Sequence, residues 1–176
     1  MIAGFEKPTY VGVVMDMDDF KMQGKSAVSE VKRELCEFSK SMGLNSRIFV
    51  GGNERLPTTA GESVSQIASY EISKDSDPVR EKFKDCVYGV GSQDGVRKVI
   101  VVTNRFSESR KIDYKLAMDI NRRQSLDCDI HVFEFRRNSQ PLSEMVEQGG
   151  CTYHFMSDTS ELRSFLNGIL EEQGYV

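Results

Sequence analysis

The sequence predicts a three-layer α/β/α domain with a Rossmann-like, mainly parallel central sheet. Two observations carry this prediction. Valine-rich apolar runs at residues 10–15 and 98–102 are typical of strands that are buried on both faces. Between such runs, apolar residues recur at a spacing of three and four, which is typical of helices that bury one face. Strands and helices in alternation favour one parallel sheet between two helical layers.

The first half of the chain supplies one complete strand-helix-strand unit. Its first strand, at residues 10–15, ends abruptly in carboxylates. A helix is predicted over residues 26–42, where the apolar positions form one stripe. Residues 46–50 form the second strand, which two glycines close. This unit is a parallel crossover and places both strands in one sheet.

The second half continues the alternation. Asp77-Pro78 resembles a helix cap followed by a proline in the first turn. Residues 98–104 read as a second central strand, because an apolar run again ends in polar groups. The remaining predicted elements are helices near residues 62–72, 77–87, 112–120, 141–148 and 158–170, and strands at residues 129–137 and 151–156.

Composition limits the classes of protein to which the chain can belong. Its 176 residues, 39% hydrophobic and 28% charged, predict a single domain spanning residues 1–176. The net charge of -4 argues against a nucleic-acid partner bound through phosphate contacts. No apolar stretch is long enough to span a membrane, and residues 1–6 lack the apolar core of a signal peptide. We therefore expect a cytoplasmic protein, with no indication of its oligomeric state.

Four cysteines are widely spaced and form no Cys-x-x-Cys pair. This spacing predicts neither a structural zinc site nor a disulfide framework. We expect reduced thiols that behave as small apolar side chains.

Three carboxylates follow the first strand within four residues: Asp16, Asp18 and Asp19. Ligands of open α/β sheets bind just beyond the carboxyl ends of the strands, which is where this acidic cluster lies. Neighbouring carboxylates repel one another, so such a cluster is compensated by a cation, a metal ion or full solvation. The sequence leaves a ligand site and a solvated acidic loop open as alternatives.

Four segments of the chain follow one another in an informative order. Residues 16–20, Asp-Met-Asp-Asp-Phe, end the first strand, and residues 57–61, Pro-Thr-Thr-Ala-Gly, precede a helix. Residues 97–104 form a strand that ends in Thr-Asn, and residues 129–162 make a closing strand-helix-strand-helix pattern. Taken together from Tyr10 to about Leu170, they resemble a von Willebrand factor A (VWA) domain.

This resemblance implies a metal-ion-dependent adhesion site for Mg²⁺ or Mn²⁺, which an acidic residue of a protein partner completes. Asp16 matches the first aspartate of the family motif. Asp18 replaces the first serine and still offers an oxygen, whereas Phe20 replaces the second serine and cannot be a ligand. Water can fill several positions around such a cation. The implied ligands of this degenerate site are Asp16, Asp18, Thr58, Thr59 and Asn104, and a site without any cofactor is equally compatible with the sequence.

Structural roles compete with these assignments. Thr58 and Thr59 can be loop and helix-entry residues, and Asn104 can cap the turn after its strand. The predicted function is a non-catalytic VWA-type module that binds a protein partner through its strand-end loops. The residues expected to contact the partner are Asp19, Phe20, Lys21 and Arg105. Together with Arg105, the cations Arg110, Lys111, Arg136 and Arg137 form either a basic rim near the sheet or a solvated face.

A second class of protein fits the same first motif. Four apolar residues followed by Asp-x-Asp resemble the start of a haloacid dehalogenase-type phosphohydrolase, with Asp16 as nucleophile and Asp18 as general acid. That chemistry requires Mg²⁺, a balancing lysine such as Lys111 or Lys115, and an acidic pair after a later strand. Only Asp158 follows the last strand, so this alternative ranks second.

Overall fold

A computed structural model describes residues 7–173, apart from residues 54, 73, 75–76 and 136–138. Its centre is a five-stranded sheet in the order β4-β1-β5-β6-β7, and every neighbouring pair is parallel. The strands are β1 (Thr9–Asp16), β4 (Arg47–Val50), β5 (Val96–Thr103), β6 (Asp129–Phe135) and β7 (Thr152–Met156). A separate small hairpin consists of β2 (Lys21–Met22) and β3 (Lys25–Ser26).

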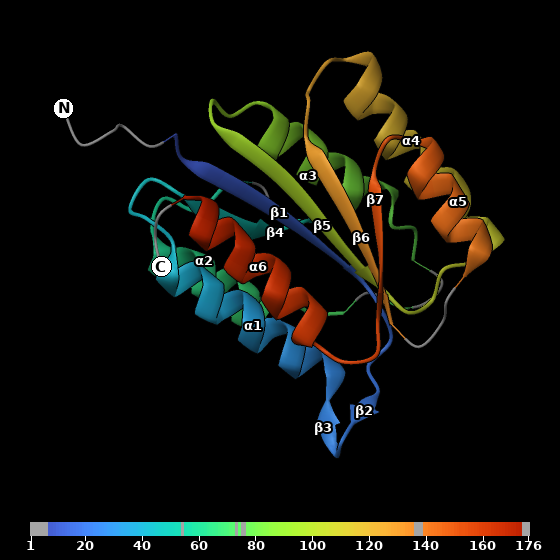
Figure 1. Ribbon diagram of the computed structural model, residues 1–176, viewed down its shortest axis with the longest axis horizontal. Helices are drawn as coiled ribbons and strands as arrows, with labels where there is room; N and C mark the ends of the chain where they lie inside the picture. Colours follow the sequence, from blue (N-terminus) through green and yellow to red (C-terminus); the bar gives the residue numbers. More distant parts are fainter. Residues whose placement is uncertain (1–6, 54, 73, 75–76, 136–138, 174–176) are drawn as a thin grey trace.

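Helices cover both faces of the sheet, as Figure 1 shows. One face packs against α1 (Ala27–Ser41), α2 (Ala60–Ser69) and α6 (Ser160–Glu172). The opposite face packs against α3 (Arg80–Gly91), α4 (Glu108–Arg123) and α5 (Gln140–Gln148). The predicted three-layer α/β/α architecture with a parallel, Rossmann-like sheet is confirmed.

The alternation of side chains along the strands divides the apolar interior into two cores. In β1, Val11, Val13 and Met15 face the layer of α1, α2 and α6. Val14 faces the opposite layer, and all of these side chains are buried. Strands buried on both faces need apolar residues at nearly every position, which is why β1 and β5 read as continuous apolar runs.

Two glycines let α3 lie close to the sheet. A Cβ atom at Gly12 would lie 2.9 Å from Val90 Cγ2, and one at Gly51 would lie 2.6 Å from the backbone oxygen of Lys82. Real Cβ atoms do not approach other atoms so closely. A side chain at Gly51 would therefore push the backbone of α3 away from the end of β4.

The order of the strands reverses between β1 and β5. From β1 the chain crosses to β4 on one side, and it later returns to β5 on the other side. Asp16, the last residue of β1, lies beside Thr103, the last residue of β5. Open α/β sheets bind their ligands at such a switch point, outside the carboxyl ends of the strands.

Several local predictions need correction. The hairpin of β2 and β3 was not predicted, because two-residue strands carry no periodicity. The helix α3 begins at Arg80 rather than at Asp77-Pro78. The strand predicted at residues 129–137 is confirmed as β6 over Asp129–Phe135, where it has neighbours on both sides, and its predicted extension to Arg137 lies outside the described residues.

All four cysteines are free thiols, as expected, and two of them, Cys86 and Cys128, are buried. Among the described helices, none has both the length and the apolar character that crossing a membrane requires.

Candidate functional site

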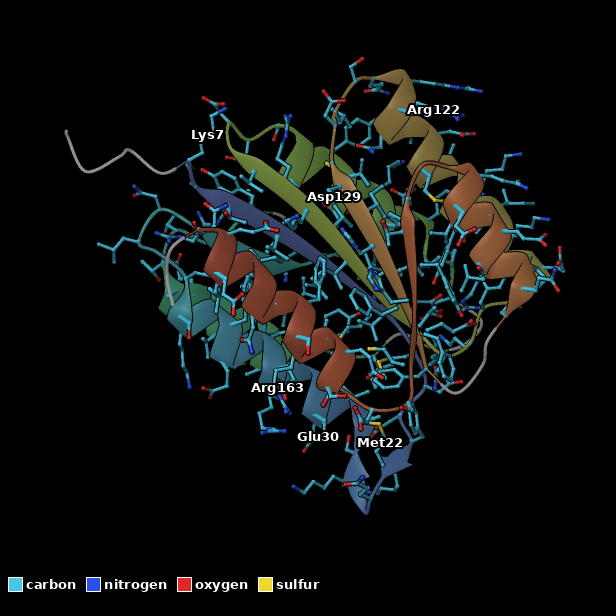
Figure 2. The ribbon with its side chains drawn as sticks, in the orientation of Figure 1. Lys7, Met22, Glu30, Arg122, Asp129 and Arg163 are labelled. Carbon is cyan, nitrogen blue, oxygen red and sulfur yellow. The ribbon has the colours of Figure 1, made fainter. Side chains whose placement is uncertain are left out.

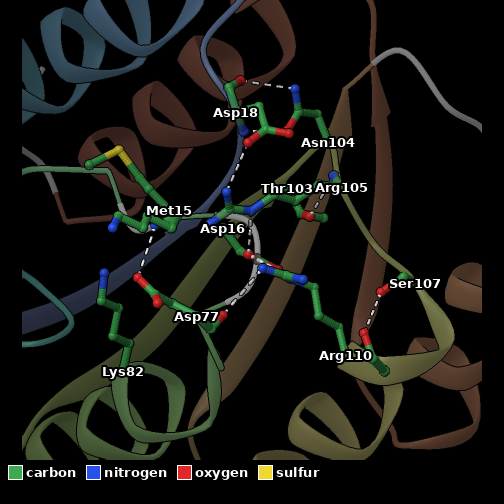
Figure 3. Close-up of polar contacts among 12 residues, drawn as sticks. Met15, Asp16, Asp18, Asp77, Lys82, Thr103, Asn104, Arg105, Ser107 and Arg110 are labelled. Atoms are coloured by element: carbon green, nitrogen blue, oxygen red, sulfur yellow. Dashed lines mark hydrogen bonds and ion pairs between the residues drawn. The ribbon is translucent and has the colours of Figure 1, made fainter.

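Asp16 lies at the switch point, and other side chains fully engage its carboxylate. Arg105 Nε donates to Oδ1 at 2.9 Å, and Arg110 Nε lies 3.0 Å from both oxygens. The hydroxyl of Tyr114 donates to Oδ2 at 2.7 Å. The side chain of Asp16 is only 1% exposed, and those of the two arginines are 5% and 7% exposed. Figure 3 shows both guanidinium groups reaching the carboxylate from the segment that follows β5. We call Asp16, Arg105, Arg110 and Tyr114 the buried arginine cluster.

Asn104 joins the loop after β1 to the loop after β5. Its Oδ1 accepts from the backbone N–H of Asp18 at 2.8 Å, and its Nδ2 donates to the backbone oxygen of Asp18 at 3.0 Å. The carboxylate of Asp18 accepts from Arg105 NH1 at 2.9 Å. Both polar ends of the Asn104 amide are thus used to hold two strand-end loops together (Figure 3).

Oppositely charged side chains meet in this region. Two carboxylates, Asp16 and Asp18, face two guanidinium groups, Arg105 and Arg110. Burial opposes the charge on Arg105, but its hydrogen bonds and ion pairs with Asp16 and Asp18 outweigh burial and raise its pKa. Burial raises the pKa of the Tyr114 hydroxyl, and the adjacent Asp16 carboxylate raises it further. Tyr114 therefore stays a neutral hydrogen-bond donor at physiological pH.

The residues present do not fit a divalent cation. Mg²⁺ needs near-octahedral oxygen ligands with free lone pairs. Both oxygens of Asp16 already accept hydrogen bonds, and two positive charges occupy the space beside them. Among the described residues, no group of three or more His, Cys, Asp or Glu side chains could hold a metal ion.

The structure does not bring Thr58 or Thr59 to Asp16. Thr59 caps α2 by accepting from the backbone N–H of Glu62 at 3.0 Å, and Glu62 completes a capping box. The backbone oxygen of Thr58 accepts from Arg47, the first residue of β4. That contact lies near the amino end of β1, and β1 is about 23 Å long at ~3.3 Å per residue. The two threonines thus take the helix-entry role that was the structural alternative.

The residues expected to contact a partner have different surroundings. Arg105 is buried in the arginine cluster and offers little surface. Asp19 is exposed, yet its carboxylate accepts from the Ser26 hydroxyl and from the Val28 N–H at the start of α1. Phe20 packs edge-on against Phe135, with ring centroids 5.5 Å apart. Lys21 is exposed at the start of the hairpin.

Sequence reasoning missed the roles of Arg110 and Tyr114. Both lie on the inner face of α4, four residues apart, and they reach Asp16 across more than ninety residues of sequence. The signal that could have found them was charge compensation, because a buried carboxylate such as Asp16 needs a partner of opposite charge. The predicted basic rim is therefore corrected: Arg105 and Arg110 are buried. Arg136 and Arg137 lie outside the described residues.

The arrangement gives no support to phosphohydrolase chemistry. A nucleophilic carboxylate must reach its substrate, whereas Asp16 is enclosed by three donor side chains. Lys111 and Lys115 line a groove between α4 and α5, and Asp158 lines a separate cleft beside α6. The structure thus does not gather the residues which that reaction requires.

Comparisons with known proteins identify the fold. No protein-family model matches the sequence, and no curated protein matches it significantly. Among solved structures, one titled "von Willebrand factor type A from Catenulispora acidiphila" superposes with a TM-score of 0.66 and 7% identity. The match covers 96% of this chain and 43% of that chain. The chain has a VWA-like fold.

A second solved structure has the same fold. The TFIIH p34 N-terminal domain superposes with a TM-score of 0.55 and 9% identity, over 91% of this chain and 96% of that chain. At such low identity the likeness concerns the fold alone. Asp16, which the sequence resemblance matches to the first metal-binding aspartate, is surrounded by the arginine cluster in this structure.

Proposed function

We propose that this chain is a non-catalytic interaction module that binds a protein partner through its strand-end loops, without a divalent cation. VWA-like domains generally mediate protein–protein interaction. One observation carries the proposal for this chain: the buried arginine cluster occupies the switch point where a metal ion or a substrate would otherwise bind.

The cluster supports this function by fixing the loops. Arg105 bridges Asp16 and Asp18, and Asn104 ties the backbone of Asp18 to the neighbouring strand. Loops held in one conformation lose little entropy when they bind, so a preorganised face favours recognition. The four free cysteines also support an intracellular location, where thiols stay reduced.

Site-specific photo-crosslinking tests the proposal. A photoreactive amino acid is placed at Ser107, which is exposed in the loop after β5, and the protein is irradiated in an extract of its source cells. The matched control carries the same amino acid at Leu44, which is 90% exposed at the opposite end of the sheet. We expect one recurring protein adduct from position 107 that position 44 does not give.

Two results would contradict the proposal. Adducts from Leu44 alone would place the partner at the other end of the sheet. Turnover of a generic phosphate ester by the wild type, lost in Asp16→Asn at a temperature where that variant is still folded, would instead favour the phosphohydrolase.

A further inference from the structure

The hairpin of β2 and β3 projects beyond the carboxyl end of the sheet. Figure 1 shows it extending from the body next to the start of α1. Gln23 and Gly24 form its tip, with φ angles of 50° and 79°. Positive φ at both central residues is typical of a tight type I′ turn. We call residues 21–26 the hairpin finger.

The base of the finger is firmly anchored. The N–H of Ala27 donates to the backbone oxygen of Phe20 at 2.7 Å, which closes the loop at its base. Phe20 packs against Phe135, and Asp19 accepts hydrogen bonds from Ser26 and Val28. Burial opposes ionisation of Asp19, but these hydrogen bonds outweigh it and lower its pKa. The finger is therefore held in a fixed position relative to α1.

A cleft of about 570 Å³ lies between the finger, α1 and the start of α6. Figure 2 shows Met22, Glu30 and Arg163 around this corner of the molecule. The apolar part of its lining comes from Phe20 and Met22, both of which also pack against the core. The cleft thus combines an apolar floor with charged walls.

The walls of the cleft carry a positive excess. Four cations and two carboxylates line the cleft, and Glu34 pairs with one of these cations from behind it, which leaves a local charge of +1 on a chain whose net charge is -4. The charged lining residues are Lys21, Lys25, Arg33, Arg163, Glu30 and Asp158.

The two arginines of the cleft already have partners. Arg33 NH2 lies 2.5 Å from Glu30, and Arg163 NH2 lies 2.6 Å from the buried Glu34. In the part of the chain that the structure describes, neither Lys21 nor Lys25 lies within 4.0 Å of a carboxylate. Lys21 interacts electrostatically with the neighbouring Asp19, and both lysines are exposed on the finger, where a binding partner can reach them.

We propose that the hairpin finger and this cleft bind an acidic segment of the protein partner. Carboxylates of the segment pair with Lys21 and Lys25, and an apolar side chain contacts Met22. This inference rests on the proposed function and names the chemistry of its partner. Complementary charge of this kind steers the encounter and sets specificity. A nucleic acid fits less well, because the phosphate backbone is repelled by the acidic remainder of the chain.

Fluorescence anisotropy with a labelled peptide tests the inference. The probe is a glutamate-rich peptide containing one phenylalanine, titrated with the full chain at low salt. The double variant Lys21→Glu/Lys25→Glu should weaken binding at least about tenfold. Its matched control, Lys111→Glu/Lys115→Glu, makes the same charge change on exposed lysines of α4 and should change binding less than about twofold.

Several outcomes would overturn the inference. Equal losses of peptide affinity in both double variants would mean that the peptide responds only to the overall charge of the protein. Absence of peptide binding by the wild type would show that the finger and cleft are not a binding site for an acidic segment. A single-stranded oligonucleotide that binds as tightly as the peptide, and loses affinity in the same variant, would indicate a general polyanion site.

The crosslinking experiment separates this inference from the function on which it rests. If Lys21→Glu/Lys25→Glu leaves the adduct from position 107 unchanged, the proposed binding through the strand-end loops is retained. The hairpin finger then does not contact that partner. If position 107 gives no adduct in the wild type, the proposed function itself fails, whatever the peptide does.

Discussion

The substitution Asp16→Asn tests the buried arginine cluster most directly. It replaces one acceptor oxygen by an NH2 donor and removes the negative charge that Arg105 and Arg110 share. Two guanidinium groups, 5% and 7% exposed, would then keep their charges beside a neutral amide. The new NH2 group of residue 16 could also face other hydrogen-bond donors, since the hydroxyl of Tyr114 donates to this side chain in the wild type.

The expected cost is large. Removing one partner of a buried ion pair costs about 3–5 kcal/mol, because the remaining buried charge loses a counter-charge. A chain of this size loses roughly 2–4 °C in melting temperature per kcal/mol, which predicts a decrease of about 6–20 °C. We expect this decrease in the presence of a chelator, measured by urea denaturation and by a thermal melt.

Asp18→Asn is the matched control. The side chain of Asp18 is 59% exposed and pairs with the same Arg105, so its loss should cost at most ~1 kcal/mol. Two results would refute the reasoning. One is an Asp16→Asn protein as stable as the wild type in chelator. The other is a wild type stabilised by Mg²⁺ or Mn²⁺, which at about a hundred times the dissociation constant would add roughly 2.7 kcal/mol.

Three further predictions concern the rest of the fold. Thr59→Ala should cost about 1 kcal/mol in urea denaturation by removing the α2 cap, without altering the response to Mg²⁺; a changed response would return Thr59 to the site. Gly51→Ala should cost about 1–3 kcal/mol by pushing α3 outward, and an unchanged midpoint would contradict that packing. Burial and then the charge of His131 lower the pKa of His154 below 6.5, so the unfolded chain binds more protons. Stability should therefore fall as the pH drops below about 6.5, and His154→Phe should reduce this slope in urea midpoints; equal slopes would exclude the mechanism.

The fold was largely predictable because its signals are local. A strand buried on both faces must be apolar at nearly every position, so β1 and β5 can be recognised in the sequence as valine-rich runs. The helices show their inner faces by a repeat of three and four. The resemblance to VWA domains then predicted which α/β fold these helices and strands form. The superposition on a VWA structure agrees with that prediction.

The candidate site was only partly predictable. The sequence placed Asp16, Asp18 and Asn104 at one edge of the sheet, because the carboxyl ends of parallel strands meet there. It could not place Thr58, since the path of an irregular loop leaves no periodic signal. The hairpin finger was missed for the same reason.

By itself, the sequence determined a layered α/β domain with an acidic cluster at the end of its first strand. Only the tertiary structure decided how that cluster is neutralised. The cations that pair with Asp16 lie 89 and 94 residues further along the chain, and Tyr114 lies 98 residues away. Local patterns fix the elements, but the pairing of buried charges depends on which elements pack side by side. Since burial makes an unpaired charge so costly, that packing gives Asp16 two arginine partners.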